Sequence, residues 1–285
     1  MVCSCCAAAI PQAALSLFLT AAAVNFTFRA VLPNSGLNRS LLRVISVLTS
    51  TVLVALGVLL SILHFSAPLR GLFFVNLCTV LSKPGPLDAF RCPLVGSASG
   101  NVLEVGPGAG ANFRCFVNAT THIDSYTTVE PNKDFTSVLL SEAASQNLSF
   151  EITPTWLRGE EINVLDASMD AVIGTHMLCS VDDPQQVLLN IDKSLKVGGF
   201  YYSMEHVSAS PQDRPVLSLS QDLLSPFFKI IADGCTFRDA EAEIFSALGD
   251  RYEIEINRFD APMPLAAFKP HVSIVAKKLK ESCLT

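Results

Sequence analysis

Charged side chains are scarce in this chain of 285 residues, at 16% of the composition against 50% for hydrophobic residues. The shortage is concentrated at the N-terminal end, because the first acidic residue is Asp88. The formal net charge is -6, and no basic stripe with interleaved aromatic residues is present. Nucleic-acid-binding proteins need clustered Lys and Arg, so we expect no nucleic-acid partner.

A zinc-binding cysteine pattern is also missing, although the chain has nine cysteines. No CxxC pair is matched by a second Cys or His pair, so we expect no bound metal. Three cysteines crowd the N-terminus at Cys3, Cys5 and Cys6, and the other six are scattered singly. Scattered cysteines are typical of reduced thiols in a domain that faces the cytosol. In that setting the sequons at Asn118 and Asn147 would carry no sugar.

The apolar excess includes a run that lacks any Asp, Glu, Lys or Arg, from Ile45 to Phe65. About 20 apolar residues in a helix span the hydrocarbon core of a bilayer, so this run predicts a membrane-embedded helix. A helix buried in a soluble core is the alternative. Residues 7–24 are a weaker apolar stretch, interrupted by Pro11. They are expected to form a second embedded segment or a surface extension, and the absence of a preceding basic residue argues against a secretory signal.

These patterns divide the chain into three parts. Residues 1–66 are expected to form a membrane anchor, 67–100 a connector rich in Pro, Gly and Ser, and 101–285 a globular domain. Basic residues flank the embedded run on both sides, so their positions leave the orientation of the anchor open. The three N-terminal cysteines are equally compatible with palmitoylation and with unmodified thiols.

Strand-like and helix-like segments alternate after residue 100, which predicts a Rossmann-like α/β fold with a parallel sheet covered on both faces. Strands are expected at 102–105, 125–131, 150–153, 169–178 and 200–207, with helices from about Ala111, at 134–146, and at 184–196 ending at Gly198 and Gly199. Segments 251–259 and 271–278 are separated only by a loop with proline, so we expect them to pair antiparallel.

The stretch VLEVGPGAGANF, residues 102–113, reads as a strand that breaks into a glycine-rich turn. Gly106, Gly108 and Gly110 would let the backbone approach a ligand closely and direct free N–H groups at it. Glu130 lies about 20 residues further on, where an acid can bind ribose hydroxyls. The unit therefore predicts an adenosine-ribose site.

Two cofactors fit this unit. Gly106, Gly108 and Ala111 satisfy the dinucleotide pattern, whereas Glu104 with Gly106, Gly108 and Gly110 satisfies the S-adenosylmethionine pattern. Glu104 can pair with the ammonium of a methionine group, but it would repel a pyrophosphate. A dinucleotide fold would also continue with parallel strands rather than an antiparallel pair. Both observations favour S-adenosylmethionine.

Five stretches resemble the methyltransferase-like seven family: VLEVGPGAGANF, MLCSV, VGGFYYSMEHV, ADGC and KPHVSIVAKK. The resemblance covers about residues 101–278. It implies a membrane-anchored class I methyltransferase that uses S-adenosylmethionine, methylates an alkyl thiol and resides on endoplasmic reticulum or lipid droplets. The sequence departs from the family between anchor and glycine turn, where a charged helix is replaced by an apolar, Pro-rich region. It also departs at WLRGEE, where the family's Gly-Glu is shifted by one residue.

The candidate site residues follow from the turn, the resemblance and the sheet edge where open α/β folds bind ligands. For the cofactor they are Glu104, Gly106, Gly108, Gly110, Glu130, Pro131, Glu160, Thr175 and His176. A thiol attacks as thiolate, so a nearby base or cation would help, and the catalytic candidates are His206, Asp233 and His271. Each has a structural alternative, such as a strand cap at His206 or an Asp-Gly turn at Asp233.

Two classes of function remain open at this point. The first is a membrane-tethered methyltransferase acting on a small lipophilic acceptor, which is an alkyl thiol by resemblance and otherwise a lipid, quinone or amine. The second is a non-catalytic membrane or lipid-droplet protein that retains the fold. The glycines of the turn, Glu104 and Glu130 are all present, which argues against a domain that has lost its cofactor site.

Overall fold

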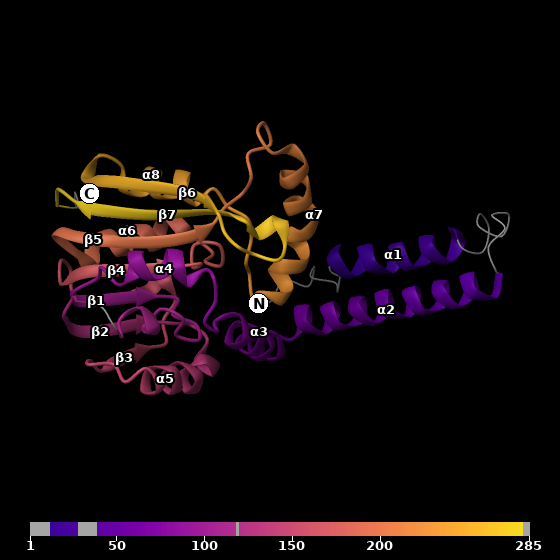
Figure 1. The fold of residues 1–285 in the computed structure, drawn as a ribbon, viewed down its shortest axis with the longest axis horizontal. Helices are drawn as coiled ribbons and strands as arrows, with labels where there is room; N and C mark the ends of the chain where they lie inside the picture. The colour runs from indigo at the N-terminus through magenta and orange to yellow at the C-terminus, as the bar shows by residue number, and fades with distance from the viewer. Residues whose placement is uncertain (1–11, 28–38, 118–119, 282–285) are drawn as a thin grey trace, which may run out of the picture.

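An arm of apolar helices extends from one edge of a seven-stranded sheet (Figure 1). This computed structural model describes residues 12–27, 39–117 and 120–281. The N-terminal cysteines Cys3, Cys5 and Cys6, and the sequon at Asn118, lie outside these residues. The sheet positions the candidate site, and the arm approaches it from outside.

The sheet has the strand order β3-β2-β1-β4-β5-β7-β6. Its first five strands are parallel to one another: β1 (Gly100–Val105), β2 (Ile123–Val129), β3 (Ile152–Thr155), β4 (Met169–Thr175) and β5 (Leu195–His206). β7 (Pro270–Lys278) runs antiparallel to both β5 and β6 (Tyr252–Asp260). The predicted parallel sheet with an antiparallel pair at its end is therefore confirmed.

Helices cover both faces of the sheet because neighbouring strand residues point to opposite sides. Leu103 belongs to a core shared with α6 (Pro184–Ser194) and α8 (Ala240–Leu248). The preceding Val102 belongs to a core shared with α4 (Asp88–Val95) and α5 (Thr136–Ser145). Because the central strands are buried on both faces, the polar side chains of the candidate site lie at the strand ends.

The arm consists of α1 (Gln12–Phe26), α2 (Arg39–Phe65) and α3 (Ala67–Leu81). α1 packs along α2, and Asn25 of α1 is hydrogen-bonded to Ser46 and Ser50 of α2 at 3.1 and 2.5 Å. The most apolar 18-residue window of residues 40–65 has a mean hydropathy of 2.4, and 22% of that window is buried. Among the helices in the described ranges, α2 is the one that is long and apolar enough to cross a membrane. The predicted second segment, 7–24, is described only from residue 12.

The predicted connector, 67–100, is largely helical. α3 and α4 occupy most of it, and α7 (Pro215–Ile231), which the sequence analysis did not predict, packs against both α2 and α3. Figure 1 shows α7 standing between the sheet and the arm. The apolar connector and this helix together join the arm to the edge of the sheet.

The helix predicted from about Ala111 is wrong. Between Gly110 and β2, the described chain forms a turn and the short 3-10 helix η3 (Phe113–Cys115). Asn112 turns its side chain inward, where Nδ2 donates to Glu104 Oε1 at 2.7 Å and to Thr175 Oγ1 at 3.0 Å. Phe113 is fully buried. Because Asn112 and Phe113 both point into the domain, this segment does not form a longer helix with one face exposed to solvent.

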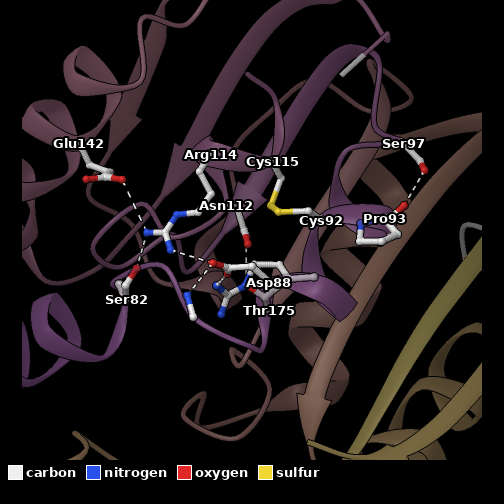
Figure 2. Close-up of a disulfide and its surroundings, with 12 residues drawn as sticks. Ser82, Asp88, Cys92, Pro93, Ser97, Asn112, Arg114, Cys115, Glu142 and Thr175 are labelled. Carbon is white, nitrogen blue, oxygen red and sulfur yellow. Dashed lines mark hydrogen bonds and ion pairs between the residues drawn. A yellow bond between two sulfur atoms is a disulfide. The ribbon is translucent and has the colours of Figure 1, made fainter. Parts of the chain in front are cut away.

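The prediction of reduced thiols is wrong for one pair. Cys92 of α4 and Cys115 of η3 form a disulfide, with Cα atoms 4.7 Å apart (Figure 2). Arg114 beside it forms ion pairs with Asp88 at 3.2 Å and with Glu142 at 3.7 Å. The two cysteines are 23 residues apart in sequence, so only the packing of α4 on η3 brings them together.

The predicted helix end at Gly198 and Gly199 is also wrong. α6 ends at Ser194 and β5 begins at once, so both glycines lie inside the strand. They form an irregularity in which Met169 pairs with Leu195, whereas Ala171 pairs with Phe200. Gly198 has φ of +88°, a backbone conformation that favours glycine in a bulge as well as in a helix cap.

Candidate functional site

The glycine turn after β1 has the backbone that its sequence predicted. The backbone φ angles of Gly106, Gly108 and Gly110 are +70°, +53° and +81°, which residues other than glycine rarely adopt. A Cβ at Gly110 would meet the Phe113 ring at 2.8 Å, whereas a Cβ at Gly108 would have only Phe135 near it, at 3.9 Å. Gly108 therefore borders open space, where its backbone is accessible to a ligand.

Glu130 follows β2 and reaches back to this turn. Its Oε2 accepts from the N–H of Gly108 at 3.2 Å, and its Oε1 accepts from the N–H of Asn132 at 3.0 Å. Burial raises the pKa of Glu130 to about 7. Two of the predicted cofactor residues, Gly108 and Glu130, are thus in direct contact, and Pro131 lines the adjoining cavity.

Glu104 lies at the bottom of the same turn and is 1% exposed. Its carboxylate accepts from Asn112 Nδ2 at 2.7 Å and from the Tyr126 hydroxyl at 2.6 Å. Burial raises the pKa of Glu104 above its ordinary value. The Oδ1 atom of Asn112 is buried and has no hydrogen-bond partner among the described residues. This carboxylate and orphaned acceptor fit a ligand that brings an ammonium group.

The turn after β4 lies against the glycine turn, since a Cβ at Gly106 would meet Met177 Cγ at 3.2 Å. His176 has φ of +53°, a strained value that is held by its N–H donating to Met204 O at 2.8 Å. The N–H groups of Met177 and Leu178 donate to Glu205 Oε1 at 3.0 and 3.2 Å. Glu205, whose pKa burial raises to about 8, therefore fixes this turn.

Three histidines meet at the ends of β4, β5 and β7. His206 and His271 pair across the β5–β7 register, and His176 Nε2 lies 2.9 Å from His271 Nε2. Burial lowers the pKa of His176 well below its ordinary value and that of His271 to about 4. Both rings are neutral at pH 7. His271 Nδ1 lies 3.1 Å from Lys269 O and therefore donates to it, which leaves its Nε2 to accept from His176.

His206 faces two cysteines. Its Nε2 lies 3.2 Å from Cys235 Sγ, and one ring nitrogen and both sulfurs, including Cys179 Sγ, lie within 4.8 Å of one another. Burial lowers the pKa of His206, but the neighbouring Cys179 and Glu205 together outweigh it, so the pKa is raised. The ring edges of Phe237 and Phe268 enclose the imidazole at centroid distances of 5.4 and 5.3 Å.

Asp233 lies in the turn after α7, with φ of +44°. Its Oδ1 accepts from Arg70 Nε of α3 at 2.8 Å, so it ties the arm to the domain. Both residues line a cavity of about 850 Å³. The cavity also borders Pro131 beside the glycine turn, Ser180 after β4, and His64 at the end of α2.

Glu160 lies on the 3-10 helix η5 (Gly159–Glu161), whose Gly159 packs near Val105 at the end of β1. Its Oε1 accepts from the N–H groups of Asp182 and Asp183 at 2.9 and 3.1 Å. Asp183 in turn caps α6, whose predicted start at residue 184 is confirmed, by accepting from Gln186 N–H at 3.0 Å. Glu160 thus supports the start of α6, and its contact with adenine stays a prediction.

Sequence analysis missed three residues that organise this site. Asn112 joins Glu104 to Thr175, Tyr126 completes the Glu104 contacts, and Arg70 binds Asp233. Glu205 stands at the predicted end of the fifth strand, but its role in holding the turn after β4 was not predicted. Asn112 carried a signal, because it stands inside the quoted glycine motif. Arg70 carried none, since its partner is 163 residues away.

Comparison with known proteins agrees with this geometry. Residues 103–203 match the family model described as a methyltransferase domain. The geranyl diphosphate C-methyltransferase of Streptomyces coelicolor, solved with S-adenosyl-L-homocysteine, superposes with a TM-score of 0.53 over 67% of this chain and 76% of its own, at 13% identity. The putative methyltransferase of Bacillus halodurans superposes with a TM-score of 0.52 over 68% of this chain and 99% of its own, at 10% identity. The fold is that of a class I methyltransferase.

Two curated relatives indicate to which methyltransferase family the chain belongs. The thiol S-methyltransferase TMT1B of Rattus norvegicus is 35% identical over 60% of this chain and 68% of its own length. The thiol S-methyltransferase TMT1A of Homo sapiens is 31% identical with the same coverage of both chains. The chain belongs to this thiol S-methyltransferase family, and the resemblance inferred from its motifs is confirmed.

Proposed function

We propose that this enzyme methylates the sulfur of a small lipophilic alkyl thiol while an apolar arm holds it at a membrane. The observation that carries the proposal is the cavity of about 850 Å³, which is lined by both the sheet edge and the arm. His64 and Arg70 border it from the arm, and Pro131 and Ser180 border it from the strand ends. An acceptor dissolved in the bilayer would reach the reaction site along this route.

The glycine turn, Glu104 and Glu130 are the residues that would hold S-adenosylmethionine. Glu130 stands where it can accept from ribose hydroxyls, and Glu104 with Asn112 Oδ1 offers acceptors for the ammonium group. Thr175 and His176 follow β4, next to the glycine turn. When bound, this cofactor would supply an electrophilic methyl carbon on a sulfonium; in-line attack by a thiolate would form the new S–C bond as the sulfonium S–C bond breaks and S-adenosylhomocysteine leaves.

The acceptor must lose its S–H proton, because the thiolate is the nucleophile and even a cysteine thiol has a pKa of about 8.5. His206 is the polar group that the geometry favours for assisting this step, since it already faces sulfur atoms. His271 is bound to His176 and to Lys269, so it orients the histidine cluster. Asp233 is engaged by Arg70 and keeps the arm over the cavity.

The membrane part of the proposal rests on α2 and on an exposed apolar face of α7. Val216, Leu219 and Leu223 lie on one side of α7 and are 81%, 59% and 65% exposed. α7 packs against α2 near its own C-terminal end, where Ile230 shares an apolar cluster with Leu60 and Leu63. Residues 1–66 would then be the anchor and 101–285 the methyltransferase domain, resident on endoplasmic reticulum or lipid droplets.

The side of the membrane that the domain faces stays a prediction. The sequence predicted the cytosol, but the Cys92–Cys115 bond favours an oxidising compartment, because structural disulfides are rare in the cytosol. Asn147 is exposed and lies in a sequon, so it reports the side. A sugar removed by glycosidase and absent from Asn147→Gln places the domain in the lumen, whereas an unmodified Asn147 with reduced Cys92 and Cys115 places it in the cytosol.

The acceptor class is tested by competition. Purified full-length protein in lipid nanodiscs is given isotope-labelled S-adenosylmethionine and a mixture of aliphatic thiols, phenols, amines and lipids. We expect label on thiol sulfur, with longer alkyl chains preferred. Label on oxygen, nitrogen or lipid in place of sulfur would identify another acceptor, and no transfer with intact cofactor binding would identify a non-catalytic protein.

A further inference from the structure

We infer that Cys179, His206 and Cys235 form a zinc site whose open fourth position takes the acceptor thiol. This inference rests on the proposed thiol methylation. The sequence predicted no metal, because it lacks paired ligand motifs. The fold instead brings single ligands together from the turn after β4, the end of β5 and the turn after α7.

The three ligand atoms lie within about 1 Å of the spacing that zinc requires. At zinc bond lengths of about 2.3 Å to sulfur and about 2.0 Å to nitrogen, tetrahedral ligand atoms lie about 3.5 to 3.8 Å apart. Here a ring nitrogen and the two sulfurs all lie within 4.8 Å of one another, with Cys235 Sγ 3.2 Å from His206 Nε2. Shifts of about 1 Å would close the set around an ion.

The ligands are also available and rigidly placed. His206 Nδ1 has no hydrogen-bond partner among the described residues, and its Nε2 contacts only thiol sulfur in the hydrogen bonds found. The carbonyl of Cys179 accepts from the N–H of Thr236 at 3.0 Å, which joins the two cysteine turns. All three ligand residues are less than 9% exposed. Glu205 holds the turn that leads to Cys179 and would act as an outer-shell support.

The chemistry suits a thiol acceptor. Two thiolates and a neutral imidazole balance the charge of Zn²⁺, and a set of three protein ligands is typical of catalytic zinc with one open position. When an alkyl thiol binds there, its S–H bond breaks, a Zn–S bond forms and the proton leaves to solvent. The bound sulfur keeps a lone pair for the methyl carbon. The thioether product has no negative charge and is a weaker ligand, so it dissociates.

The first experiment measures metal directly. Full-length protein, purified without chelator under reducing conditions, is analysed for zinc by plasma mass spectrometry. We expect about one zinc per chain, a loss of tenfold or more in Cys179→Ser and Cys235→Ser, and no loss in Cys78→Ser, which alters a free cysteine of α3. Calorimetry with S-adenosylhomocysteine checks that each variant is folded. Zinc-free native protein that takes up no added Zn²⁺, or a Cys179–Cys235 disulfide under these conditions, would overturn the site.

The second experiment separates the metal site from the proposed function. In protein loaded with Co²⁺, thiolate ligation gives charge-transfer absorption that does not depend on turnover. We expect an alkyl thiol to change these bands and the matching alcohol to leave them unchanged. If the absorption bands do not change when the thiol is added, the ion is structural and its role in binding the acceptor is refuted. Intact bands together with methylation of a non-thiol acceptor would refute the proposed function but retain the metal site.

Discussion

We propose that single residues at the glycine turn determine whether the site can hold its cofactor. Glu130 is the clearest case, because its carboxylate accepts from the N–H of Gly108 and stands where ribose hydroxyls would bind. The sequence predicted from spacing alone that an acid about 20 residues beyond the turn takes the ribose hydroxyls, but it did not predict the contact with Gly108. It did not predict that Glu130 would be buried enough to titrate near neutral pH.

Cofactor affinity should therefore depend on pH. Burial raises the pKa of Glu130 from 4.5 to about 7, so the cofactor-free fold favours the protonated acid, and this contribution to stability is lost as pH rises from 4.5 to 7. Ribose hydroxyls donate best to the ionised carboxylate, so affinity should rise across the same range, by up to about tenfold per pH unit below the pKa. Calorimetry with S-adenosylhomocysteine at pH 6 and pH 8 measures this change. Glu130→Gln should bind weakly at both values, and an unchanged pH slope in that variant would assign the effect to another group.

His206 should affect turnover more than cofactor binding. His206→Ala removes the imidazole that faces the two cysteines, while Glu104, Glu130 and the glycine turn stay in place. We expect kcat for thiol methylation to fall by about 100-fold or more, with the dissociation constant for S-adenosylhomocysteine changed by less than about threefold. His122→Ala alters an exposed histidine directly before β2, at the amino ends of the parallel strands and so opposite the candidate site, and serves as control. Equal losses of turnover and cofactor affinity would make His206 a structural residue.

At the scale of elements, the sequence predicted the strands well because their apolar residues alternate with clear turn signals. It predicted the antiparallel end from the short loop between β6 and β7. It failed where long-range contacts decide the local structure. η3 forms in place of the helix predicted after Gly110, because Asn112 is hydrogen-bonded to Glu104 and Cys115 is bonded to Cys92. The proposed zinc ligands could not be predicted from the sequence for the same reason, since they come from separate segments.

The disulfide between α4 and η3 should stabilise the domain. Closing a loop of 23 residues restricts the unfolded chain by about 3 kcal/mol. Cys115→Ser should therefore unfold at lower denaturant than the native protein, and added reductant should lower the native midpoint toward that of the variant. Cys78→Ser, which changes an unbonded cysteine, should keep the native midpoint. Identical midpoints for Cys115→Ser and the oxidised native protein would contradict the bond.

On the scale of the whole molecule, the arm and the sheet meet at one cavity, and the Arg70–Asp233 ion pair connects them. Charges on α2 should release the protein from membranes. Val54→Arg with Val58→Arg places two cations on exposed positions of this helix, at about 3 kcal/mol each on insertion scales. We expect the variant to move from the carbonate-resistant membrane pellet to the soluble fraction. Leu165→Arg, at an exposed position of the domain, should stay in the pellet. Retention of the α2 variant would contradict α2 as the anchor.

Labelled-methyl transfer by two matched glycine variants tests the central claim most directly. Gly108 and Gly198 both have positive φ and room for a side chain, but only Gly108 lies in the cofactor turn. The measurement is label from S-adenosylmethionine on the sulfur of an alkyl thiol, followed by mass spectrometry. We predict labelled thioether from the native protein and from Gly198→Arg, and none from Gly108→Arg. Labelled thioether from Gly108→Arg at the native rate would contradict the account.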